Sequence, residues 1–338
     1  MRYRNVIILR FFCVGGALMK NYILKRSFSA FITIIVVFTI NFIIINIAPG
    51  NPIKTMMGKE TDNIEQTKAL EEKYGLNKPL YEQYFRYLKN ISTGDLGISI
   101  IYNKPVSKMI LDKIGPTILL VLTSAIISLF LGTAMGIVAA RKEGGFIDVS
   151  LSGINYVLNA LPSFWLGLML IILFSTKLKW LPTLGMTDPR AGYTGIKYVK
   201  DVVIHLILPV TTLVLIKIPL YFRIAKSSVL QVTNEDFVMT LRAAGMNEKK
   251  IFRKYIFKNA ILPTITVFGI SLAYLITGVA LIEIVFAWPG TGRLVLNAIN
   301  QRDYPVLMGI YLIMSIAIAV MMMVVDIVYA IVDPRIRY

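Results

Sequence analysis

Long apolar segments alternate with short polar ones along almost the whole chain. A helix needs about 20 apolar residues to cross a bilayer, and six segments reach roughly that length. They lie at about residues 28–48, 115–140, 151–176, 202–222, 259–285 and 304–330. This pattern predicts an all-α integral membrane protein with six transmembrane helices. We expect residues 19–338 to form a single transmembrane domain.

Two of these segments carry residues that predict how their helices are shaped or packed. In the third, Leu161-Pro162-Ser163 interrupts the apolar run, and proline inside a helix predicts a kink. In the second, Gly132 and Gly136 are four residues apart. Small residues at this spacing let two helices approach closely, so we expect a tight helix contact there.

The first 18 residues resemble a signal peptide only superficially. Basic residues precede a short apolar run, but Arg10 interrupts that run. A second basic cluster, Lys25-Arg26, then precedes a full-length span. We expect translation to begin at Met19; the alternative is that residues 1–18 are an N-terminal extension.

The segment between the first two spans predicts a small helical cap outside the membrane. Helices are expected at residues 64–74 and 80–90, with Gly75 ending the first and Pro79 starting the second. The second has an aromatic stripe formed by Tyr81, Tyr84, Phe85 and Tyr87. Such a stripe suits packing on the membrane interface or on the helix bundle, and receiving a soluble partner is a compatible alternative.

Charge and composition support a membrane location. The chain is 56% hydrophobic with a formal net charge of +17, and its basic residues cluster at span ends. We therefore do not expect nucleic-acid binding. Because short cytoplasmic loops are enriched in lysine and arginine, both termini are predicted to be cytoplasmic, although five basic residues between Lys177 and Lys200 fall in a loop that this topology places outside.

The longest polar, basic segment between two apolar runs is residues 234–263, and its pattern predicts two short helices joined by a glycine hinge. Asn234 is expected to cap the first helix, with Glu235 and Asp236 in its first turn. Arg242 falls in the last turn, and Gly245 suits the left-handed position that ends the helix.

The second helix of this polar segment is expected to start at Asn247, before Pro263 leads into the next apolar run. Phe237, Leu241 and Ala244 share one face of the first helix. The lysines of the second helix suit phospholipid headgroups. From the pattern alone, an interfacial lipid-binding helix and a docking surface for a soluble protein are equally good interpretations.

The chain has no motif for enzymatic or metal chemistry. There is no G-x-x-x-x-G-K-[ST] sequence for a nucleoside triphosphate and no H-E-x-x-H or G-x-S-x-G sequence, so we expect neither an enzyme nor a bound cofactor. Cys13 has no partner for an intrachain disulfide. His205 has no second histidine or cysteine beside it, which favours a structural role over a metal site.

Two acidic residues lie inside apolar segments, Glu283 in the fifth and Asp326 in the sixth. Glu283 ends the fifth span, where an intramembrane acid could mark an ion pathway. The Trp288-Pro289-Gly290 turn follows closely and suits a membrane interface. We therefore expect Glu283 to be partly hydrated.

Several separated motifs carry a family resemblance over residues 19–338. They are APGNP (48–52), KYGLNKPLYEQY (73–84), GDLGISI (94–100), LPSFWLGL (161–168), NEDFVMTLRAAGM (234–246), FAWPGTGRL (286–294), RDYPVLMG (302–309) and VDPRIR (332–337). With them, the chain resembles an ATP-binding-cassette importer permease of the dipeptide/oligopeptide/nickel group, and more narrowly the first of the two permeases of such systems.

The resemblance implies a set of partners in the cell membrane. The chain would pair with a second, homologous permease, two cytoplasmic ATPases would use the ATP, and an extracytoplasmic substrate-binding protein would deliver the cargo. Peptides are the expected cargo, with nickel or a metal chelate as the alternative. An ion-coupled secondary transporter, which would need acids such as Glu283 or Asp326, and a non-transporting scaffold are the other classes considered.

The resemblance also implies that residues 234–258 form a cytoplasmic coupling segment that contacts the ATPases. Gly245 matches the glycine of the family's coupling motif, whereas Met239-Thr240-Leu241 replaces its E-A-A triplet. The residues expected to couple to the ATPases are Asn234, Glu235, Asp236, Phe237, Leu241, Arg242, Ala243, Ala244 and Gly245.

Overall fold

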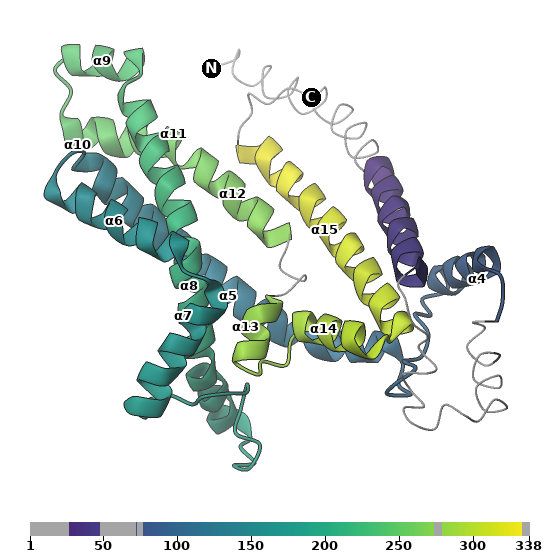
Figure 1. Ribbon diagram of the computed structural model, residues 1–338. Coiled ribbons are helices and arrows are strands. Elements are labelled where there is room, and N and C mark those ends of the chain that lie inside the picture. The colour runs from purple at the N-terminus through teal and green to yellow at the C-terminus, as the bar shows by residue number, and fades with distance from the viewer. Residues whose placement is uncertain (1–26, 48–71, 73–76, 274–278, 333–338) are drawn as a thin grey trace. The chain divides into compact units, whose positions relative to one another are not determined.

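The computed structural model describes residues 27–47, 72, 77–273 and 279–332 (Figure 1). Residues 1–18 and most of the first predicted cap helix lie outside this range. The chain divides into two compact units, one formed by Met1–Met109 with Asn297–Tyr338 and the other by Ile110–Leu296. The described residues contain five helices long and apolar enough to cross a membrane, or six spans if one bent pair counts as one.

The first unit contains the first span, the described cap helix and the last span. The helix Ser27–Ile47 is the first span, and α15 (Tyr304–Val332) is the last. The cap helix predicted at residues 80–90 is confirmed as α4 (Leu80–Ser92), with Pro79 as its N-cap. The first unit therefore combines the first span and the cap helix with the last span.

The aromatic stripe of α4 is divided between packed and exposed residues. Tyr84 packs edge-on against Phe42 at a centroid distance of 5.3 Å, and Tyr87 stacks on Phe38 at 5.8 Å. Tyr81 is 65% exposed. One side of α4 thus rests on the first span, as aromatic pairs at these distances do.

A buried carboxylate holds the start of α15 to the segment that follows α4. Asp303 is fully buried and accepts hydrogen bonds from the Ser99 hydroxyl and, at 3.2 Å, from the Ile100 N–H. The Tyr87 hydroxyl donates to the Leu96 carbonyl at 3.3 Å. These bonds join the GDLGISI and RDYP motifs within the first unit.

The second unit is built around two helices that are longer than a bilayer requires. The predicted second span lies in α5 (Val106–Arg141), most of which belongs to this unit, and the fourth span lies in α8 (Gly195–Thr233). Between them, α6 (Phe146–Ala160) is followed by α7 (Ser163–Leu170) and the π-helical η2 (Ile171–Lys177). The bend between α6 and α7 is 103°, which confirms the predicted break at Leu161-Pro162-Ser163.

The fifth predicted span, residues 259–285, differs from a single helix with those bounds. Its helix begins at Glu248 and runs to Leu272, so it includes residues that the sequence assigned to a separate polar helix. A separate short helix, α13 (Ala280–Val285), starts after Val279, and α14 (Thr291–Gln301) follows the tryptophan turn. The helix therefore starts before residue 259 and ends before residue 285, so the predicted span is not one continuous helix with those bounds.

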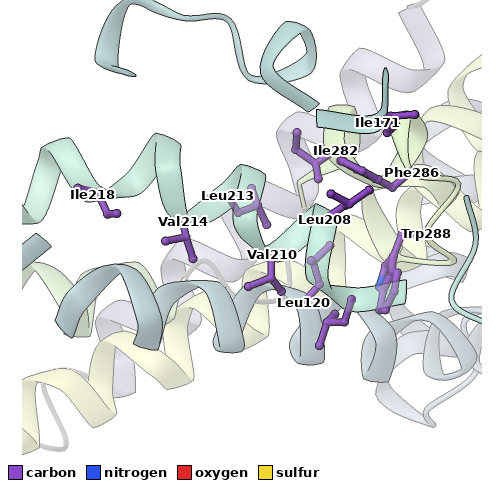
Figure 2. Close-up of a cluster of buried hydrophobic side chains, with 11 residues drawn as sticks. Leu120, Ile171, Leu208, Val210, Leu213, Val214, Ile218, Ile282, Phe286 and Trp288 are labelled. Atoms are coloured by element: carbon purple, nitrogen blue, oxygen red, sulfur yellow. The ribbon is translucent and has the colours of Figure 1, made fainter. Parts of the chain in front are cut away.

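The core of the second unit lies where α8 meets α5, η2 and α13 (Figure 2). Its most deeply buried side chains include Leu120 and Trp288, both with no exposed surface. The cluster is formed by Leu120, Ile171, Leu206, Leu208, Val210, Leu213, Val214, Ile218, Ile282, Phe286 and Trp288. Within a bilayer, close van der Waals packing of such side chains holds the helices together.

The two glycines of α5 allow close contact with α8. A Cβ atom added at Gly132 would lie 2.8 Å from the Ile218 carbonyl oxygen, and one added at Gly136 would lie 2.5 Å from that of Phe222. Real side chains do not pack this closely, so neither position has room for a larger residue. The predicted tight helix contact is confirmed.

Candidate docking surface

The first helix of the coupling segment is α9 (Asp236–Ala243), with Glu235 as its N-cap. The prediction that Asn234 caps α9 was wrong. Asn234 is the C-cap of α8, and its N–H donates to the Gln231 carbonyl at 3.2 Å. Helix α8 continues to Thr233, so the backbone of Asn234 closes its last turn and is not available to start α9. Asp236 lies in the first turn of α9, as predicted.

Gly245 ends α9 in the left-handed conformation that the sequence predicted, with φ of +74°. Its N–H donates to the Arg242 carbonyl at 2.9 Å, and the Met246 N–H donates to the Leu241 carbonyl at 3.2 Å. This pair of bonds is the Schellman arrangement that closes a helix C-terminus. A residue with a side chain would be strained by this φ, although no atom lies within 4 Å of an added Cβ.

The second helix of the coupling segment is the beginning of a longer helix. The Asn247 side chain caps α10 (Glu248–Ile251) by accepting the Lys249 N–H at 2.9 Å, as predicted. Helical structure then continues through η3 (Phe252–Ile256) and α11 (Phe257–Ala260) into α12 (Leu262–Ala273). The expectation of two short, separate helices was therefore wrong for the second one.

Pro263 does not end this longer helix, because it lies in the first turn of α12, where a missing N–H is tolerated. The polar helix after Gly245 and the apolar helix after Ile261 consequently form one candidate span, Glu248–Leu272.

One side of α9 is buried against the ends of three other helices. Val238 and Ile251 have no exposed surface, and both pack in a cluster with Val229 of α8. Phe237 and Leu241 are half-buried against the same cluster. These two residues attach α9 to the rest of the second unit. Their predicted contact with a partner stays a prediction.

The opposite side of α9 is open. Asp236, Met239, Thr240 and Ala243 are all exposed, and their spacing of i, i+3, i+4 and i+7 places them on one helix face. We call these four residues the docking face. Met239 is 68% exposed.

The sequence identified Asp236 and Ala243 of this face but missed Met239 and Thr240. In the sequence analysis, Met239 and Thr240 appeared only as two of the three residues that replace the family's E-A-A triplet. The signal that could have found them is their helical spacing, opposite the apolar residues at positions 237, 238 and 241. Glu235, Arg242, Ala244 and Gly245 are also exposed, at the two ends of the face.

An ion pair bridges the glycine hinge. The Arg242 Nε donates to the Glu248 Oε1 at 2.7 Å, and this hydrogen bond raises the pKa of Arg242. Behind the hinge, the Arg141 guanidinium at the end of α5 lies 4.8 Å from the centre of the Phe252 ring. The first contact spans the hinge between α9 and α10 but is exposed and therefore weak, whereas the second joins α5 to η3.

Glu283 lies in a different kind of site. It is fully buried. Its carboxylate accepts hydrogen bonds from the Thr117 hydroxyl at 3.0 Å and from the Arg293 N–H at 2.9 Å. The Trp288 indole N–H donates to the Pro116 carbonyl at 2.9 Å beside it. The expected partial hydration of Glu283 was wrong, because the turn folds back over the carboxylate. The side chain of Asp326 lies outside the described residues.

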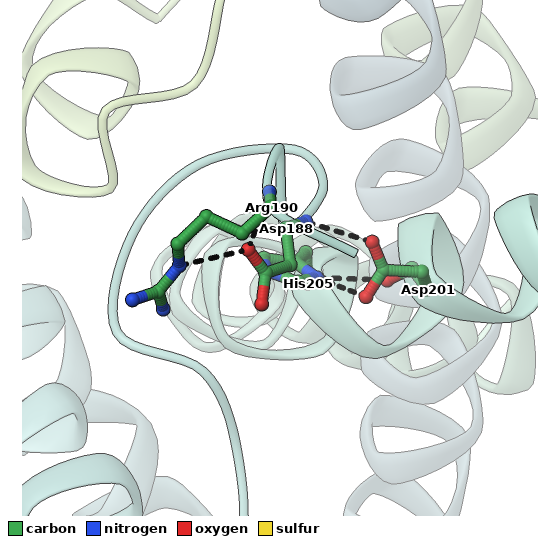
Figure 3. A network of polar contacts seen from close by, with 4 residues as sticks. All are labelled: Asp188, Arg190, Asp201 and His205. Atoms are coloured by element: carbon green, nitrogen blue, oxygen red, sulfur yellow. Dashed lines mark hydrogen bonds and ion pairs between the residues drawn. The ribbon is translucent and has the colours of Figure 1, made fainter. Parts of the chain in front are cut away.

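His205 belongs to a polar network that orders the loop before α8 (Figure 3). Its Nδ1 lies 3.2 Å from the Asp201 carboxylate, which also accepts the Asp188 N–H at 2.8 Å. Hydrogen bonds from the Arg190 N–H groups lower the pKa of Asp188. In the part of the chain that the structure describes, no three histidine, cysteine or acidic residues are grouped as metal ligands.

These features define a class of protein: an all-helical, multi-pass membrane protein with an anchored polar segment between two spans. Residues 132–338 match the family of binding-protein-dependent transport system inner membrane components. Residues 19–123 match the N-terminal family of the same transport system membrane components. The chain belongs to this family, and it is a permease of an ATP-binding-cassette importer.

Relatives cover nearly the whole chain. The oligopeptide transport system permease AppB of Bacillus subtilis is 36% identical over 321 residues, covering 95% of this chain and 100% of the relative. With the same coverage, the dipeptide transport system permease DppB of Alkalihalophilus pseudofirmus is 35% identical, and the glutathione transport system permease GsiC of Escherichia coli K12 is 33% identical.

A solved structure shares the fold. An inward-facing conformation of the MetNI methionine ABC transporter matches with a TM-score of 0.52 at 16% identity, covering 67% of this chain and 97% of the matched chain. Together these findings make the chain a multi-pass plasma-membrane component of a transport system. Permeases of this class work with an ATPase and a binding protein.

Proposed function

We propose that this chain is a permease subunit of an ATP-driven importer of di- and oligopeptides. It pairs with a second, homologous permease, and a substrate-binding protein delivers the peptide from outside. Two cytoplasmic ATPases use the ATP, and this chain binds no cofactor itself. The observation that carries the coupling role is that α9 is anchored on one side and open on the other.

The docking face suits a protein partner better than a lipid surface. A lipid-binding amphipathic helix has lysine and arginine on its polar face. On α9 the only basic residue is Arg242, and Glu248 already pairs with it. The exposed face instead presents an acid, a methionine and small side chains. This combination fits an apolar groove with a basic or neutral rim on an ATPase.

The anchored side of α9 explains how docking could move the spans. Val238 packs in one cluster with Val229 and Val232 of α8 and with Ile251 and Ile256 of the fifth-span helix. Close-packed interiors transmit displacements rather than absorb them. A push on α9 is therefore passed to two spans at once, which supports alternating access driven by closure of the ATPases.

The cargo assignment rests on the relatives. AppB and DppB are named for oligopeptide and dipeptide transport, and GsiC for glutathione transport. No feature of the described residues favours nickel over a peptide. The basic clusters beside the coupling segment support a cytoplasmic location for that segment and for both termini.

The decisive experiment changes the docking face in the assembled importer. With a tag on this chain, Met239→Arg should lower ATPase co-purification and peptide uptake at least tenfold, whereas Met239→Leu should retain both. As a matched test of lipid binding, Lys249→Gln with Lys250→Gln on α10 should leave co-purification unchanged. These two lysines are exposed and lie outside the docking face.

The opposite result would overturn the proposal. Normal co-purification of the ATPases with Met239→Arg, together with loss of function in the lysine variant, would favour lipid binding. Uptake that survives ATP depletion but collapses with an uncoupler would instead assign the chain to an ion-coupled class.

A further inference from the structure

Helix α4 packs against the side of the first span, short of the residue at which that span ends (Figure 1). The Tyr84 ring lies edge-on to Phe42 at 5.3 Å between centroids, and its hydroxyl lies 2.8 Å from the Thr39 hydroxyl. The described part of the span ends at Ile47, and the apolar run ends at Ala48. At 1.5 Å per residue, Phe42 and Thr39 lie about 8 and 12 Å from Ile47 along the span. A tyrosine side chain is shorter than the larger of these distances, so α4 lies level with the apolar part of the span.

The last span places α4 at a matching depth. The Tyr87 hydroxyl donates to the Pro305 carbonyl at 3.4 Å, and Pro305 is the second residue of α15. The Tyr87 ring also stacks on Phe38 of the first span. Helix α4 therefore touches the last span where its apolar run begins and the first span before its apolar run ends. A helix with these contacts lies at the edge of a bilayer rather than above it.

Aromatic side chains also extend from a side of α4 that does not rest on the span. Tyr81 and Phe85 are 65% and 66% exposed and lie one helical turn apart. We call these two residues the aromatic shoulder. With 3.6 residues per turn, the aromatic shoulder falls between the packed side that contains Tyr84 and an exposed charged side that contains Glu82 and Lys89. This sequence of a packed, an aromatic and a charged side is typical of a helix that lies in the membrane interface.

We propose that α4 is an interfacial helix whose aromatic shoulder inserts into the phospholipids of one leaflet, with Glu82 and Lys89 at the level of the headgroups. Aromatic side chains favour this boundary between water and hydrocarbon. A lysine can extend its ammonium group to the headgroups while its alkyl stem stays in apolar surroundings. In the topology proposed above, this is the outer leaflet.

The surface of the first span favours lipid over a soluble partner for the aromatic shoulder. Ile40 and Ile43, which lie level with the Tyr84 contacts, are 49% and 47% exposed. They belong to a helix that is long and apolar enough to cross a membrane. Lipid that surrounds the span at this level also reaches α4, and a soluble protein would have to displace that lipid to contact the aromatic shoulder.

Insertion of α4 also sets the position of the last span. The segment after α4 carries the Ser99 hydroxyl and the Ile100 N–H, which both donate to the buried Asp303 carboxylate just before α15. Helix α4 rests on the first span through Tyr84 and is joined to the start of α15 through these bonds. Contact between the aromatic shoulder and lipid therefore fixes the depth of one end of both spans.

Spin-label accessibility of the assembled importer, in nanodiscs of phosphatidylcholine and phosphatidylglycerol, tests this placement. A nitroxide is attached to Tyr81→Cys or Phe85→Cys in a Cys13→Ser background, and power saturation is measured with oxygen and with nickel ethylenediaminediacetate. Oxygen concentrates in hydrocarbon, whereas the nickel complex stays in water. We expect the ratio of oxygen to nickel accessibility at positions 81 and 85 to be about threefold higher than at Glu82→Cys.

Matched positions calibrate this measurement. Ile43→Cys on the first span is the lipid reference and should give a ratio at least as high as that of the aromatic shoulder. Lys89→Cys on the charged side should give a ratio as low as that of Glu82→Cys. The Tyr81 and Phe85 side chains are mostly exposed, so their replacement should leave the melting temperature in detergent unchanged.

Three results would overturn the placement. Nickel accessibility at positions 81 and 85 as high as at position 82 would put the aromatic shoulder in water. Low accessibility to both reagents would mean that another membrane protein covers it. Addition of the substrate-binding protein should change neither value, and a fall in both values on its addition would make the aromatic shoulder a docking site for that protein.

Discussion

The coupling segment and the tryptophan turn, which we define as residues 283–294, use glycine in opposite ways. Gly245 of the coupling segment has a positive φ and open space around it. Gly290 and Gly292 of the tryptophan turn have ordinary φ values, but an added Cβ would collide with Glu283 or with the Ala280 backbone. The first glycine shapes a surface, and the other two allow a turn to close over a buried carboxylate.

The coupling segment therefore offers an exposed surface, whereas the tryptophan turn is a closed and rigid structure. In the tryptophan turn, the Glu283 carboxylate and the Trp288 indole N–H both have hydrogen-bond partners inside the protein. In the coupling segment, the apolar side of α9 is buried and the polar side is exposed. Substitutions should therefore damage stability in the turn and communication with the ATPases in the coupling segment.

The largest loss of stability is expected from Gly292→Ala. The new methyl group would lie 2.8 Å from the Ala280 Cα and backbone nitrogen, and backbone atoms cannot move aside as a flexible side chain can. We expect a loss of about 3 kcal/mol, measured as a lower melting temperature in detergent. Gly115→Ala is the matched control, because no atom lies within 4 Å of its Cβ position. Equal melting temperatures for both variants would contradict the crowded turn.

A smaller loss is expected from Glu283→Ala. The substitution removes the acceptor for the Arg293 N–H and the Thr117 hydroxyl in a buried site. Unpaired buried donors predict a cost of about 2 kcal/mol, again measured by thermal melting. Glu283→Gln keeps one acceptor oxygen and should lose less. An unchanged melting temperature for Glu283→Ala would show that this carboxylate does not hold the turn.

Gly245→Val should affect function more than stability. The valine would be strained by about 1–2 kcal/mol in the left-handed conformation but would meet no neighbouring atom. We expect normal membrane insertion and at least a tenfold loss of peptide uptake. Gly245→Asn is the matched control, because asparagine tolerates this conformation, and it should retain most uptake. Wild-type uptake with valine would argue against a role for the hinge in coupling.

The smallest effect is expected from Arg242→Gln. The Arg242 and Glu248 side chains are 43% and 64% exposed, so solvent screens their ion pair. Its removal should cost less than about 1 kcal/mol, as judged from the melting temperature. Adding Glu248→Gln to this variant should produce almost no further change. A loss as large as that of Gly292→Ala would mean that the hinge, and not the turn, is the rigid element.

The comparison also shows which features were readable from the sequence. Length and hydropathy predicted the spans, and Leu161-Pro162-Ser163 predicted the break between α6 and α7. Gly245 was predicted because a helix C-terminus is a local signal, complete within the residues around it. The coupling role of residues 234–258 came from the family resemblance and stays a prediction.

The features that were missed depend on contacts between distant residues or on competition between neighbouring helices. Glu283 is buried because Thr117 of α5 and the backbone near Gly290 approach it, and no local pattern reports that approach. The sequence around Asn234 suits either the start of α9 or the end of α8. In the structure Asn234 is the C-cap of α8, the longer helix. Helical spacing places Phe237 and Met239 on different faces of α9. Only the buried cluster showed that the face with Phe237 packs against the protein.

The central claim is that the exposed face of α9 contacts an ATPase. Cysteine crosslinking tests it most directly, in a Cys13→Ser background, with one cysteine at a time at positions 236–243 of the assembled importer. The account predicts crosslinks to the ATPase from positions 236, 239, 240 and 243 and none from position 238, which is fully buried. Crosslinking without this helical period, or no ATPase crosslink from position 239, would contradict it.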